Sequence, residues 1–264
     1  MIRFDYRKCI RCKNCCNECH IKILGFDQWP EMVHPDGCIR CGHCIAVCPV
    51  EGAVYMDDDS YTPLASFDAG DTTVHPSTLQ NFMAFRRSTR KYTREDVTEE
   101  DIRKIIEAGR YAPTGGNRQS LRFIVLKDAL PEVISMVAQE LHDDIGFYRQ
   151  YVGRLTLERI HNDSLQGQDG LFFGAPVVLG VADLKGKCID GGIAVAHMEL
   201  MANALGLGAL INGIIVLAAN RQKRIAERIG VPEGYELVIT LGIGHPNVTF
   251  TQLPPRRTPS ITWK

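Results

Sequence analysis

The chain has 264 residues, enough for one large domain or two unequal ones. Hydrophobic residues make up 45% and charged residues 23%, a balance that is too apolar for a disordered chain. The formal net charge is -1, so no basic excess favours binding to nucleic acid or to an anionic membrane. Nine of the ten cysteines fall within residues 1–48, and this uneven distribution divides the chain in two.

The first eight residues contain no apolar run of the length that a secretory signal needs, so we expect a cytoplasmic protein. Thiols stay reduced in that compartment, which favours metal or redox chemistry for a cysteine cluster over disulfides. Residues 200–220 carry no charge and are long enough to cross a bilayer. Their asparagines and glycines argue against a membrane span, and we predict a buried helix, a loop and a short strand there.

The N-terminal cysteines form a repeat with an offset of 29 residues, in which Cys9, Cys12, Cys15 and Cys19 recur as Cys38, Cys41, Cys44 and Cys48. Both repeats contain Cys-Ile-Arg-Cys, which indicates a duplicated module. The spacing Cys-x2-Cys-x2-Cys-x3-Cys is that of bacterial two-cluster ferredoxins, where the fourth cysteine of each run binds the other cluster. We therefore expect one 4Fe–4S cluster on Cys9, Cys12, Cys15 and Cys48, and another on Cys38, Cys41, Cys44 and Cys19.

A pair of structural zinc sites is the alternative, because four thiolates also satisfy tetrahedral zinc. Zinc sites normally combine two Cys-x-x-Cys halves over a longer spacer, so this spacing favours iron–sulfur clusters. Two residues depart from the ferredoxin pattern: His20 replaces a proline, and the surplus Cys16 competes with Cys15 as the third ligand. The resemblance to ferredoxins covers residues 3–56, and such a module by itself only carries electrons.

Three aspartates at residues 57–59 begin a polar stretch. We predict an N-terminal domain over residues 1–58, a linker over residues 59–76 and a second domain over residues 77–264. The second domain has the length of an ordinary single domain. Its one cysteine, Cys188, reads as a buried thiol.

Helices and strands alternate irregularly in the second domain. Ser77 and Gln80 form a capping-box pattern for a helix that runs into Arg86, and Thr98 with Asp101 predicts the start of another. Further helical patterns cover residues 130–160, 189–205 and 220–229. Short runs rich in Val, Ile and Leu predict strands over residues 121–126, 176–182 and 235–243.

Three polar segments of this domain suggest a phosphate-bearing ligand. The run Arg86–Arg90 places three guanidinium groups and two hydroxyls on five residues, and Arg pairs bidentately with phosphate. The run 112–119 is a Gly-rich polar loop, and the tail 253–257 ends in two arginines. Each also has a simpler interpretation: a solvated helix end, an ordinary turn and a disordered basic tail.

Together and in this order, the segments resemble the nitroreductase family of flavin enzymes over residues 77–260. The resemblance implies an α+β fold, a mixed sheet flanked by helices behind the small ferredoxin-like domain. It also implies FMN and a homodimer in which the 113–119 loop meets the flavin bound mainly by the other subunit. The FMN-binding residues that it assigns are Arg86, Arg87, Ser88, Arg90, Pro113, Thr114, Gly115, Asn117, Ile211, Asn212, Gly213, Arg256 and Arg257.

Within this resemblance, Arg86, Ser88 and Arg90 would hold the phosphate, the ribityl chain and the ring edge. The backbone around Ile211–Gly213 would face the reactive ring nitrogen. Two departures concern the substrate pocket: Ser120-Leu121 replaces a frequent Pro-Trp, and Asn212 stands where some members carry an acidic residue.

These features favour an oxidoreductase that passes electrons from a low-potential donor through both clusters to FMN. The flavin can accept electrons singly and deliver them in pairs, so no nucleophilic side chain is needed and we assign no catalytic residue. The expected acceptor is an electron-poor small molecule, a nitroaromatic or a quinone. Reduced ferredoxin or NAD(P)H could be the donor, although no Gly-x-Gly-x-x-Gly fingerprint follows a predicted strand.

Two alternatives remain at this stage. The chain could be an electron-transfer or redox-sensing protein that docks a protein partner and turns over no small molecule. It could also be a reductive dehalogenase or a flavin reductase of the same superfamily.

Overall fold

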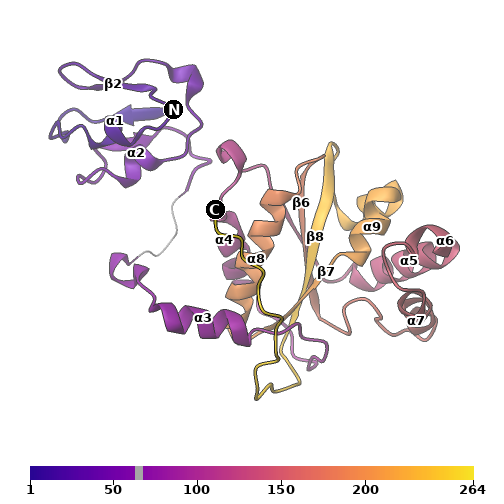
Figure 1. Ribbon diagram of the computed structural model, residues 1–264. Helices are drawn as coiled ribbons and strands as arrows, with labels where there is room; N and C mark the ends of the chain where they lie inside the picture. Colours follow the sequence, from indigo (N-terminus) through magenta and orange to yellow (C-terminus); the bar gives the residue numbers. More distant parts are fainter. Residues whose placement is uncertain (63–67) are drawn as a thin grey trace. The chain divides into compact units, whose positions relative to one another are not determined.

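The structure of the protein, a computed structural model, describes residues 1–62 and 68–264 (Figure 1). The chain divides into two compact units: residues 1–73 with 114–118, and residues 74–113 with 119–264. The division after Thr73 falls within the predicted linker 59–76, of which residues 63–67 lie outside the described part. Among the described helices, none combines the length and the apolar character that a membrane crossing requires.

The first unit is built from short elements. They are β1 (Ile2–Phe4), α1 (Asn14–Glu18), β2 (Leu24–Phe26), β3 (Pro30–Met32), η1 (Pro35–Gly37), α2 (His43–Ala46), β4 (Val54–Met56) and η2 (Ala69–Thr72). β1 pairs with β4 and β2 pairs with β3, both antiparallel. The later segment of this unit contains η3 (Gly115–Asn117).

The sequence repeat of the first unit is also a repeat of its backbone. α1 and α2 begin 29 residues apart, and each follows a residue in the left-handed region, Lys13 at φ 66° and Gly42 at φ 75°. Arg11 and Arg40 share the same region two residues earlier, at φ 61° and 54°. Left-handed backbone is unfavourable for a side-chain-bearing residue, so its recurrence at matching positions confirms the duplicated module.

The core of the first unit is small. The six buried residues of its core cluster are Ile2, Cys15, Ile23, Leu24, Cys44 and Val54. A unit of this size rarely folds stably on so little apolar surface without a disulfide or a bound metal. Two of the six buried residues are predicted cluster ligands, so the stability of this unit depends on the cysteine sites.

The second unit contains a four-stranded antiparallel sheet. Its strands are β5 (Arg122–Leu126), β6 (Val177–Leu184), β7 (Gly208–Asn212) and β8 (Tyr235–Gly244), in the spatial order β5-β6-β8-β7. The three predicted strands are confirmed, and β7 is the short strand expected within residues 200–220. β6 is almost entirely buried and the second half of β8 is buried throughout, as expected for central strands that are covered on both faces.

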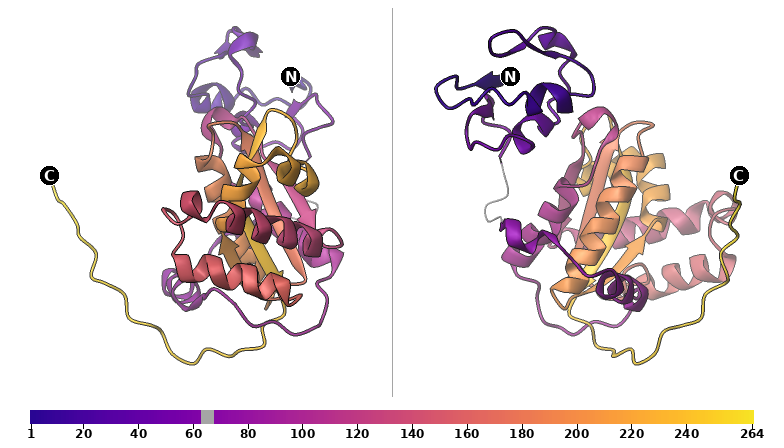
Figure 2. Two further views of the ribbon diagram at one scale, coloured as in Figure 1. Left: turned by 90° about the vertical axis from the view of Figure 1, so that its right-hand side faces the viewer. Right: turned by 60° about the vertical axis from the view of Figure 1, so that its left-hand side comes forward.

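Helices cover both faces of this sheet (Figure 2). The helices of the second unit are α3 (Pro76–Phe85), α4 (Glu99–Arg110), α5 (Leu130–Asp143), α6 (Ile145–Tyr148), α7 (Arg154–Leu165), α8 (Ile189–Ala204), α9 (Ile214–Arg221) and α10 (Lys223–Ile229). α4 and α8 pack on one face with Val177 and Leu179 of β6, while α5, α9 and α10 pack on the other with Val178. Successive side chains of β6 point to opposite faces of the sheet, so this strand contributes to two separate hydrophobic cores.

Local signals predicted most helix starts. Thr98 caps α4 by accepting a hydrogen bond from the Asp101 N–H, as expected. The capping-box prediction at Ser77 is wrong, because the Nδ1 of His75 accepts from the Ser77 N–H and Pro76 opens the helix. The helix expected to begin at residue 220 is preceded by α9, which starts at Ile214.

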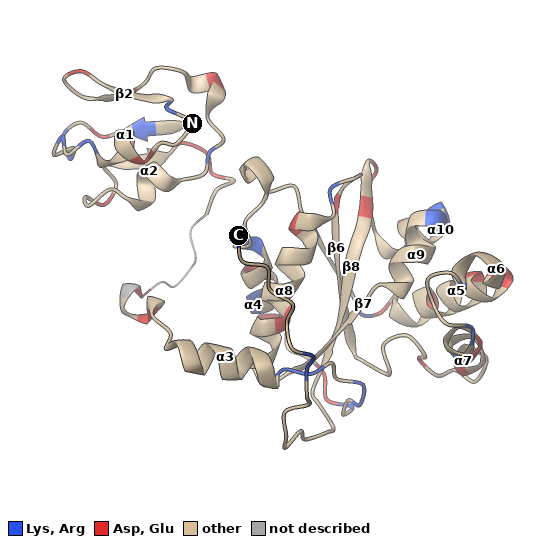
Figure 3. Ribbon diagram, viewed as in Figure 1, with Lys and Arg blue, Asp and Glu red and all other residues tan. Residues whose placement is uncertain are grey.

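The segment after α3 carries a concentration of Lys and Arg and is bound to the edge strand β7 (Figure 3). The Thr89 N–H donates to the Ala209 carbonyl over 2.8 Å, and Ser88 forms an isolated bridge with Ala209. A Cβ at Gly208 would lie 2.5 Å from the Thr89 Oγ1. Glycine at 208 is therefore what lets the basic segment lie against the sheet.

We predict that Gly208→Ala lowers the free energy of unfolding by about 1–3 kcal/mol, since the methyl group must displace buried Thr89. Gly192→Ala on α8 is the matched control, because a Cβ there meets no atom within 4 Å. The control should gain about 0.5–1 kcal/mol from helix propensity. Urea unfolding followed by circular dichroism measures both, and a Gly208→Ala protein as stable as the control would contradict the close contact.

Candidate functional site

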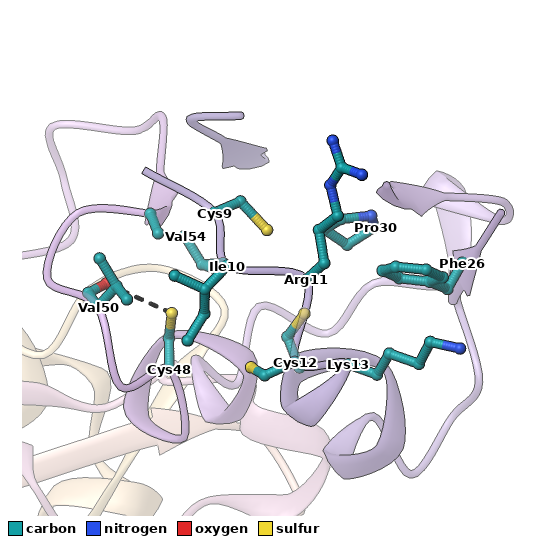
Figure 4. A pocket seen from close by; sticks show the side chains of 12 residues that line it. Cys9, Ile10, Arg11, Cys12, Lys13, Phe26, Pro30, Cys48, Val50 and Val54 are labelled. Carbon is teal, nitrogen blue, oxygen red and sulfur yellow. Dashed lines mark hydrogen bonds between the residues drawn. The ribbon is translucent and has the colours of Figure 1, made fainter. Parts of the chain in front are cut away.

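The first unit contains a hollow between the two cysteine repeats. Its sulfur-bearing lining residues are Cys9, Cys12, Cys15 and Cys48. Figure 4 shows the side chains of Cys9, Cys12 and Cys48 around this space, with Ile10 and Val54 beside them. The walls are almost wholly apolar, so a charged group bound there would lie in a medium of low dielectric constant.

A second hollow of the first unit has the corresponding lining, with sulfur atoms from Cys19, Cys38, Cys41 and Cys44. Ile2, Ile23 and Leu24 supply apolar walls here. Each hollow thus takes three cysteines from one repeat and the fourth from the other. This is the grouping that the sequence predicts for two clusters with exchanged fourth ligands.

Burial controls the protonation of the innermost thiols. It raises the pKa of Cys44 to about 11, and burial together with the neighbouring Cys16 raises the pKa of Cys15 to about 12. These thiols are neutral at physiological pH, and a metal that binds them must displace their protons. Cys15 and Cys44 occupy equivalent places in the two repeats, so both hollows share this property.

The surplus thiol Cys16 does not line either hollow. Its Sγ donates to the Gly25 carbonyl over 3.3 Å, and it lies 4.0 Å from the Sγ of Cys15. The pKa of Cys16 is raised, chiefly by burial. Of the two competing cysteines, Cys15 is therefore the one turned toward the first hollow.

The donor set of each hollow fits a cluster of several metal atoms. Four soft thiols face a space with apolar walls, which suits iron and sulfide. Within residues 1–62 and 68–264, no three His, Cys, Asp or Glu side chains converge as one metal ion would require.

The later segment of the first unit touches the second hollow. The Asn117 side-chain amide donates to the carbonyls of Ile39 and Arg40, over 2.9 Å in each case. Ile39 and Arg40 both line the second hollow. The predicted flavin-binding loop, which includes Thr114, Gly115 and Asn117, is thereby bound to the cysteine repeat that begins at Cys38.

The second unit contains a larger cavity of about 520 Å³, within the range of ligand pockets. It is lined by α3, the basic segment, the end of α8 and the chain after β8, through Asn81, Phe82, Phe85, Arg86, Arg87, Thr89, Asn203, Gly206, Leu207, Gly208, Pro246, Val248, Thr249 and Phe250. Two predicted FMN-binding residues, Arg86 and Arg87, lie in this lining. Its walls combine aromatic rings with positive charge, a suitable combination for an aromatic anion.

Arg86 has a partner that the sequence did not predict. Its Nη1 lies 2.8 Å from Oε1 of Glu199, and both side chains are largely buried. Burial raises the pKa of Glu199, while the charge of Arg86 opposes that shift. Glu199 lies on α8 among apolar residues, 113 positions from Arg86, so no local pattern could have indicated it.

Arg87 is left with unmatched positive charge. Its Nη2 donates to the Ala84 carbonyl, but its buried Nε has no hydrogen-bond partner among the described residues. Burial lowers the pKa of Arg87, and the charges of Arg256 and Arg86 lower it further. Three guanidinium groups therefore share one region, and a dianion such as a phosphate would relieve their repulsion.

The other predicted FMN residues of the second unit lie near the β7 edge or on the surface. Ser88 is half-buried beside Ala209, whereas Arg90 is exposed and close enough to Tyr92 to affect its pKa. The Asn212 side chain is already engaged, donating to the Leu171 carbonyl and accepting from the Ile214 N–H. Exposed positions are Pro113, Ile211, Gly213, Arg256 and Arg257.

The expectation that Cys188 is a buried thiol is wrong. Cys188 is exposed, because it precedes α8 at the N-cap position. Ser120, the first residue of the departure noted in the sequence, is buried and donates to Asp183 over 2.6 Å. That hydroxyl thus anchors the start of β5.

Comparison with known proteins matches residues 83–245 to the nitroreductase family. This stretch is more than half of the chain. The chain belongs to the nitroreductase family. Residues 1–49 match the 4Fe–4S dicluster domain, which sets aside the zinc alternative and agrees with the two four-cysteine hollows.

Two relatives and one solved structure illustrate the likeness. The NAD(P)H FMN reductase of Bacillus subtilis is 30% identical over 61% of this chain and 62% of its own length. A ferredoxin of Streptomyces griseus is 41% identical over 19% of this chain and 47% of its own. The chain therefore spans less than two thirds of the length of either. A nitroreductase with bound FMN from Desulfitobacterium hafniense is 28% identical, with a TM-score of 0.53 over 72% of this chain and 99% of its own.

For the nitroreductase domain we predict a coupling energy of about 1–3 kcal/mol between Arg86 and Glu199 in a double-mutant cycle built with Arg86→Gln and Glu199→Gln. The pair is largely buried, so each single change leaves the other charge without its partner. The control cycle uses Glu99 and Arg103 on α4, an exposed pair at 3.4 Å that should show no measurable coupling. Urea unfolding supplies all the free energies, and equal coupling in both cycles would contradict a structural role for Glu199.

Proposed function

We propose that the protein is an FMN-dependent oxidoreductase that receives electrons through two 4Fe–4S clusters and reduces an electron-poor organic acceptor, of nitroaromatic or quinone type. The observation that carries the proposal is the union, in one chain, of two four-cysteine hollows with a nitroreductase domain whose basic cavity contains a buried Arg87 Nε that has no hydrogen-bond partner among the described residues. A cluster carrier supplies single electrons and a flavin converts them into pairs, so the two parts are chemically complementary.

In this proposal each hollow holds one cluster. The first uses Cys9, Cys12, Cys15 and Cys48, and the second uses Cys38, Cys41, Cys44 and Cys19. The clusters, when bound, supply one-electron transfer at potentials that depend on burial and on hydrogen bonds to sulfur. The buried apolar side chains of Val54, Ile23 and Leu24 limit the access of water to the thiolates.

FMN fits the cavity of the second unit by charge. The unmatched Nε of Arg87 offers a buried donor, and Arg86 and Arg256 add positive charge beside it. These residues, with Arg257, would hold the phosphate, while Ser88 and Arg90 would contact the ribityl chain and the ring edge. The backbone of Ile211, Asn212 and Gly213 would lie along the flavin ring. The flavin, when bound, supplies the two-electron reduction of the acceptor.

The loop with Pro113, Thr114, Gly115 and Asn117 has two roles in the proposal. By its resemblance to the family it contacts the flavin bound mainly by the other subunit. Through Asn117 it is also bound to the carbonyls that line the second hollow.

A homodimer is supported by unpaired apolar surface. α3 has no buried residue, although Leu79, Met83 and Phe85 each leave more than 40% of their surface exposed. Apolar side chains in one helix normally face a core or a partner. The C-terminal residues 251–264 are also exposed throughout, including Trp263 at 87%. A second copy of the chain would cover these surfaces.

The proposal is tested by anaerobic purification followed by rapid mixing with a reduced viologen. About eight irons per chain, four for each cluster, and one FMN are expected. Absorbance of the clusters should fall first and that of the flavin next, followed by flavin reoxidation when a quinone or nitroaromatic is added. Clusters that become reduced while the flavin stays oxidised would contradict the electron relay. A reduced flavin that no small acceptor reoxidises would instead favour a redox-sensing protein.

The matched variants for this test are Cys38→Ser and Cys16→Ser. Cys38 lines the second hollow, so its replacement should remove that cluster and slow flavin reduction at least about ten-fold. Cys16 lines neither hollow, and its replacement should leave the iron content unchanged. Loss of iron from the Cys16 variant would reverse the assignment of Cys15 as ligand.

We further predict that Arg87→Gln weakens FMN binding at least about ten-fold, because a charge-assisted hydrogen bond to phosphate is lost. The FMN-free variant should unfold no more easily than the parent, since a crowded and unmatched cation is removed. Arg103→Gln, at an exposed position of α4, is the control. Fluorescence titration of FMN and thermal unfolding of the apoprotein measure the two effects. An Arg87 variant with unchanged FMN affinity would place the phosphate elsewhere.

A further inference from the structure

The two cysteine repeats differ sharply in charge although their ligands are identical. Residues 7–13 read Arg-Lys-Cys-Ile-Arg-Cys-Lys, with four cations and no acidic residue. The equivalent residues 36–42 read Asp-Gly-Cys-Ile-Arg-Cys-Gly, with one cation and one carboxylate. Residues that both copies of a duplicated module require are retained in both copies. We therefore relate the extra positive charge of residues 7–13 to a function of the first repeat alone.

The cations beside the first hollow are held by aromatic rings and not by carboxylates. The Arg11 guanidinium carbon lies 3.8 Å from the centre of the Trp29 ring, and the Lys13 Nζ lies 4.6 Å from that of Phe26. In the described part of the chain, neither cation has a carboxylate within salt-bridge distance. A cation that packs on an aromatic ring keeps its charge available to a partner. Its side chain is already ordered before the partner binds, so less conformational entropy is lost on binding.

The equivalent cation of the second repeat is already paired. Arg40 Nη1 lies 3.1 Å from an Asp58 carboxylate oxygen, and His43 Nδ1 lies 3.2 Å from Glu18. Both residues line the second hollow, as Arg11 and Lys13 line the first. The guanidinium charge of Arg40 is therefore paired at the second hollow, whereas that of Arg11 at the first hollow has no carboxylate partner among the described residues.

The first hollow also reaches the surface. Cys12 is exposed, and Ile10 leaves 62% of its surface open to solvent. Tyr6, 48% exposed, lies 5.4 Å from the Trp29 ring and extends the apolar part of this face. An apolar centre beside a charged rim is the usual anatomy of a transient protein interface. The neighbouring hairpin over residues 24–32 adds two carboxylates, Asp27 and Glu31, and no cation, so the four cations of residues 7–13 still leave a positive surplus on this face.

We propose that the face formed by Tyr6, Ile10, Arg11, Lys13 and Trp29 is the docking surface for an acidic electron-carrier protein, which delivers electrons to the first cluster. The inference rests on the proposed function and names its donor class. In each encounter one electron passes from the reduced donor to the cluster held at the first hollow, and no bond is made or broken. Two encounters supply the pair that one acceptor molecule needs. Complementary charge speeds such encounters and makes them sensitive to salt.

The test measures binding of an acidic 2Fe–2S ferredoxin to the oxidised full-length holoprotein by calorimetry at low and high ionic strength. The double variant Arg11→Gln/Lys13→Gln should bind about ten-fold more weakly at low salt. The difference should nearly disappear at about 0.5 M salt, where exposed charges are screened. Arg11→Lys keeps the charge and should retain most of the affinity.

Arg40→Gln is the matched control, because it removes the same charge from the same position of the other repeat. Arg40→Gln should change the affinity for ferredoxin less than about two-fold, compared with the loss of about ten-fold expected for the double variant. Equal losses from Arg11→Gln and Arg40→Gln would reflect net charge alone and would overturn the proposal. Unchanged binding in the double variant would overturn it as well. So would tighter binding of a DNA duplex than of ferredoxin through Arg11 and Lys13.

Reduction by a small cationic viologen separates this inference from the proposed function. The double variant should accept electrons from viologen at least as fast as the parent, with the same cluster spectrum, because protein docking is impaired while repulsion of the cationic reductant is reduced. Slower viologen reduction or loss of iron in the double variant would mean that Arg11 and Lys13 support the cluster itself, and would overturn the docking role. Failure of the flavin to become reduced in the parent would contradict the proposed function while leaving ferredoxin binding intact.

Discussion

Cys48 reaches back from the end of the second repeat to the hollow framed by Cys9, Cys12 and Cys15, and Cys19 does the same in the opposite direction. Neither repeat can surround a hollow alone. A bound cluster would therefore join segments far apart in sequence, as a disulfide does. The core of six buried residues is too small to hold them together by burial alone. For that reason we expect cluster binding to be coupled to the folding of this unit.

The second unit has a comparable dependence on a group that carries charge. Glu199 neutralises Arg86, but Arg87 and Arg256 add positive charge that no described carboxylate balances at the buried Nε. Such crowding costs stability in the free protein and is recovered when an anion binds. The ample core on both faces of the sheet can tolerate this cost, whereas the first unit could not. In each unit, the groups that are unfavourable in the free protein thus lie at the proposed ligand site: the buried thiols in the first unit and the crowded guanidinium groups in the second.

Sequence alone predicted those features that depend on local signals. The cysteine offset, the cap at Thr98 and the buried strands all follow from residues close together in the chain. The cap at His75 was missed because an imidazole acceptor is uncommon there, although Pro76 was a usable sign. The Arg86–Glu199 pair joins residues 113 positions apart, and the contact of Asn117 with Ile39 joins residues 78 positions apart. The periodicity of the sequence cannot predict contacts between residues so far apart.

The order of the strands could not be predicted from local sequence signals either. β8 lies between β6 and β7 in the sheet, and long connections separate these strands in the chain. The polar segments that carry the family resemblance were readable because they are continuous in sequence. The contacts that bring these segments together could not be read from the sequence. Thr89 contacts Ala209 of β7, and only a glycine at position 208 leaves room for the Thr89 side chain. Candidate FMN-binding residues could thus be proposed one by one from the sequence, whereas their arrangement in space could not.

Duplication gives both halves of the first unit the same ligands, so the cysteines cannot determine which way electrons move. Direction must come from the residues between them, and there the repeats diverge. The first loop has unpaired cations, an exposed Cys12 and an aromatic support. The second has a paired Arg40 and carbonyls bound by Asn117. An acidic donor protein is attracted to cations that have no carboxylate partner. In the proposed electron transfer, the loop of the first repeat is therefore the one suited to receive the protein donor.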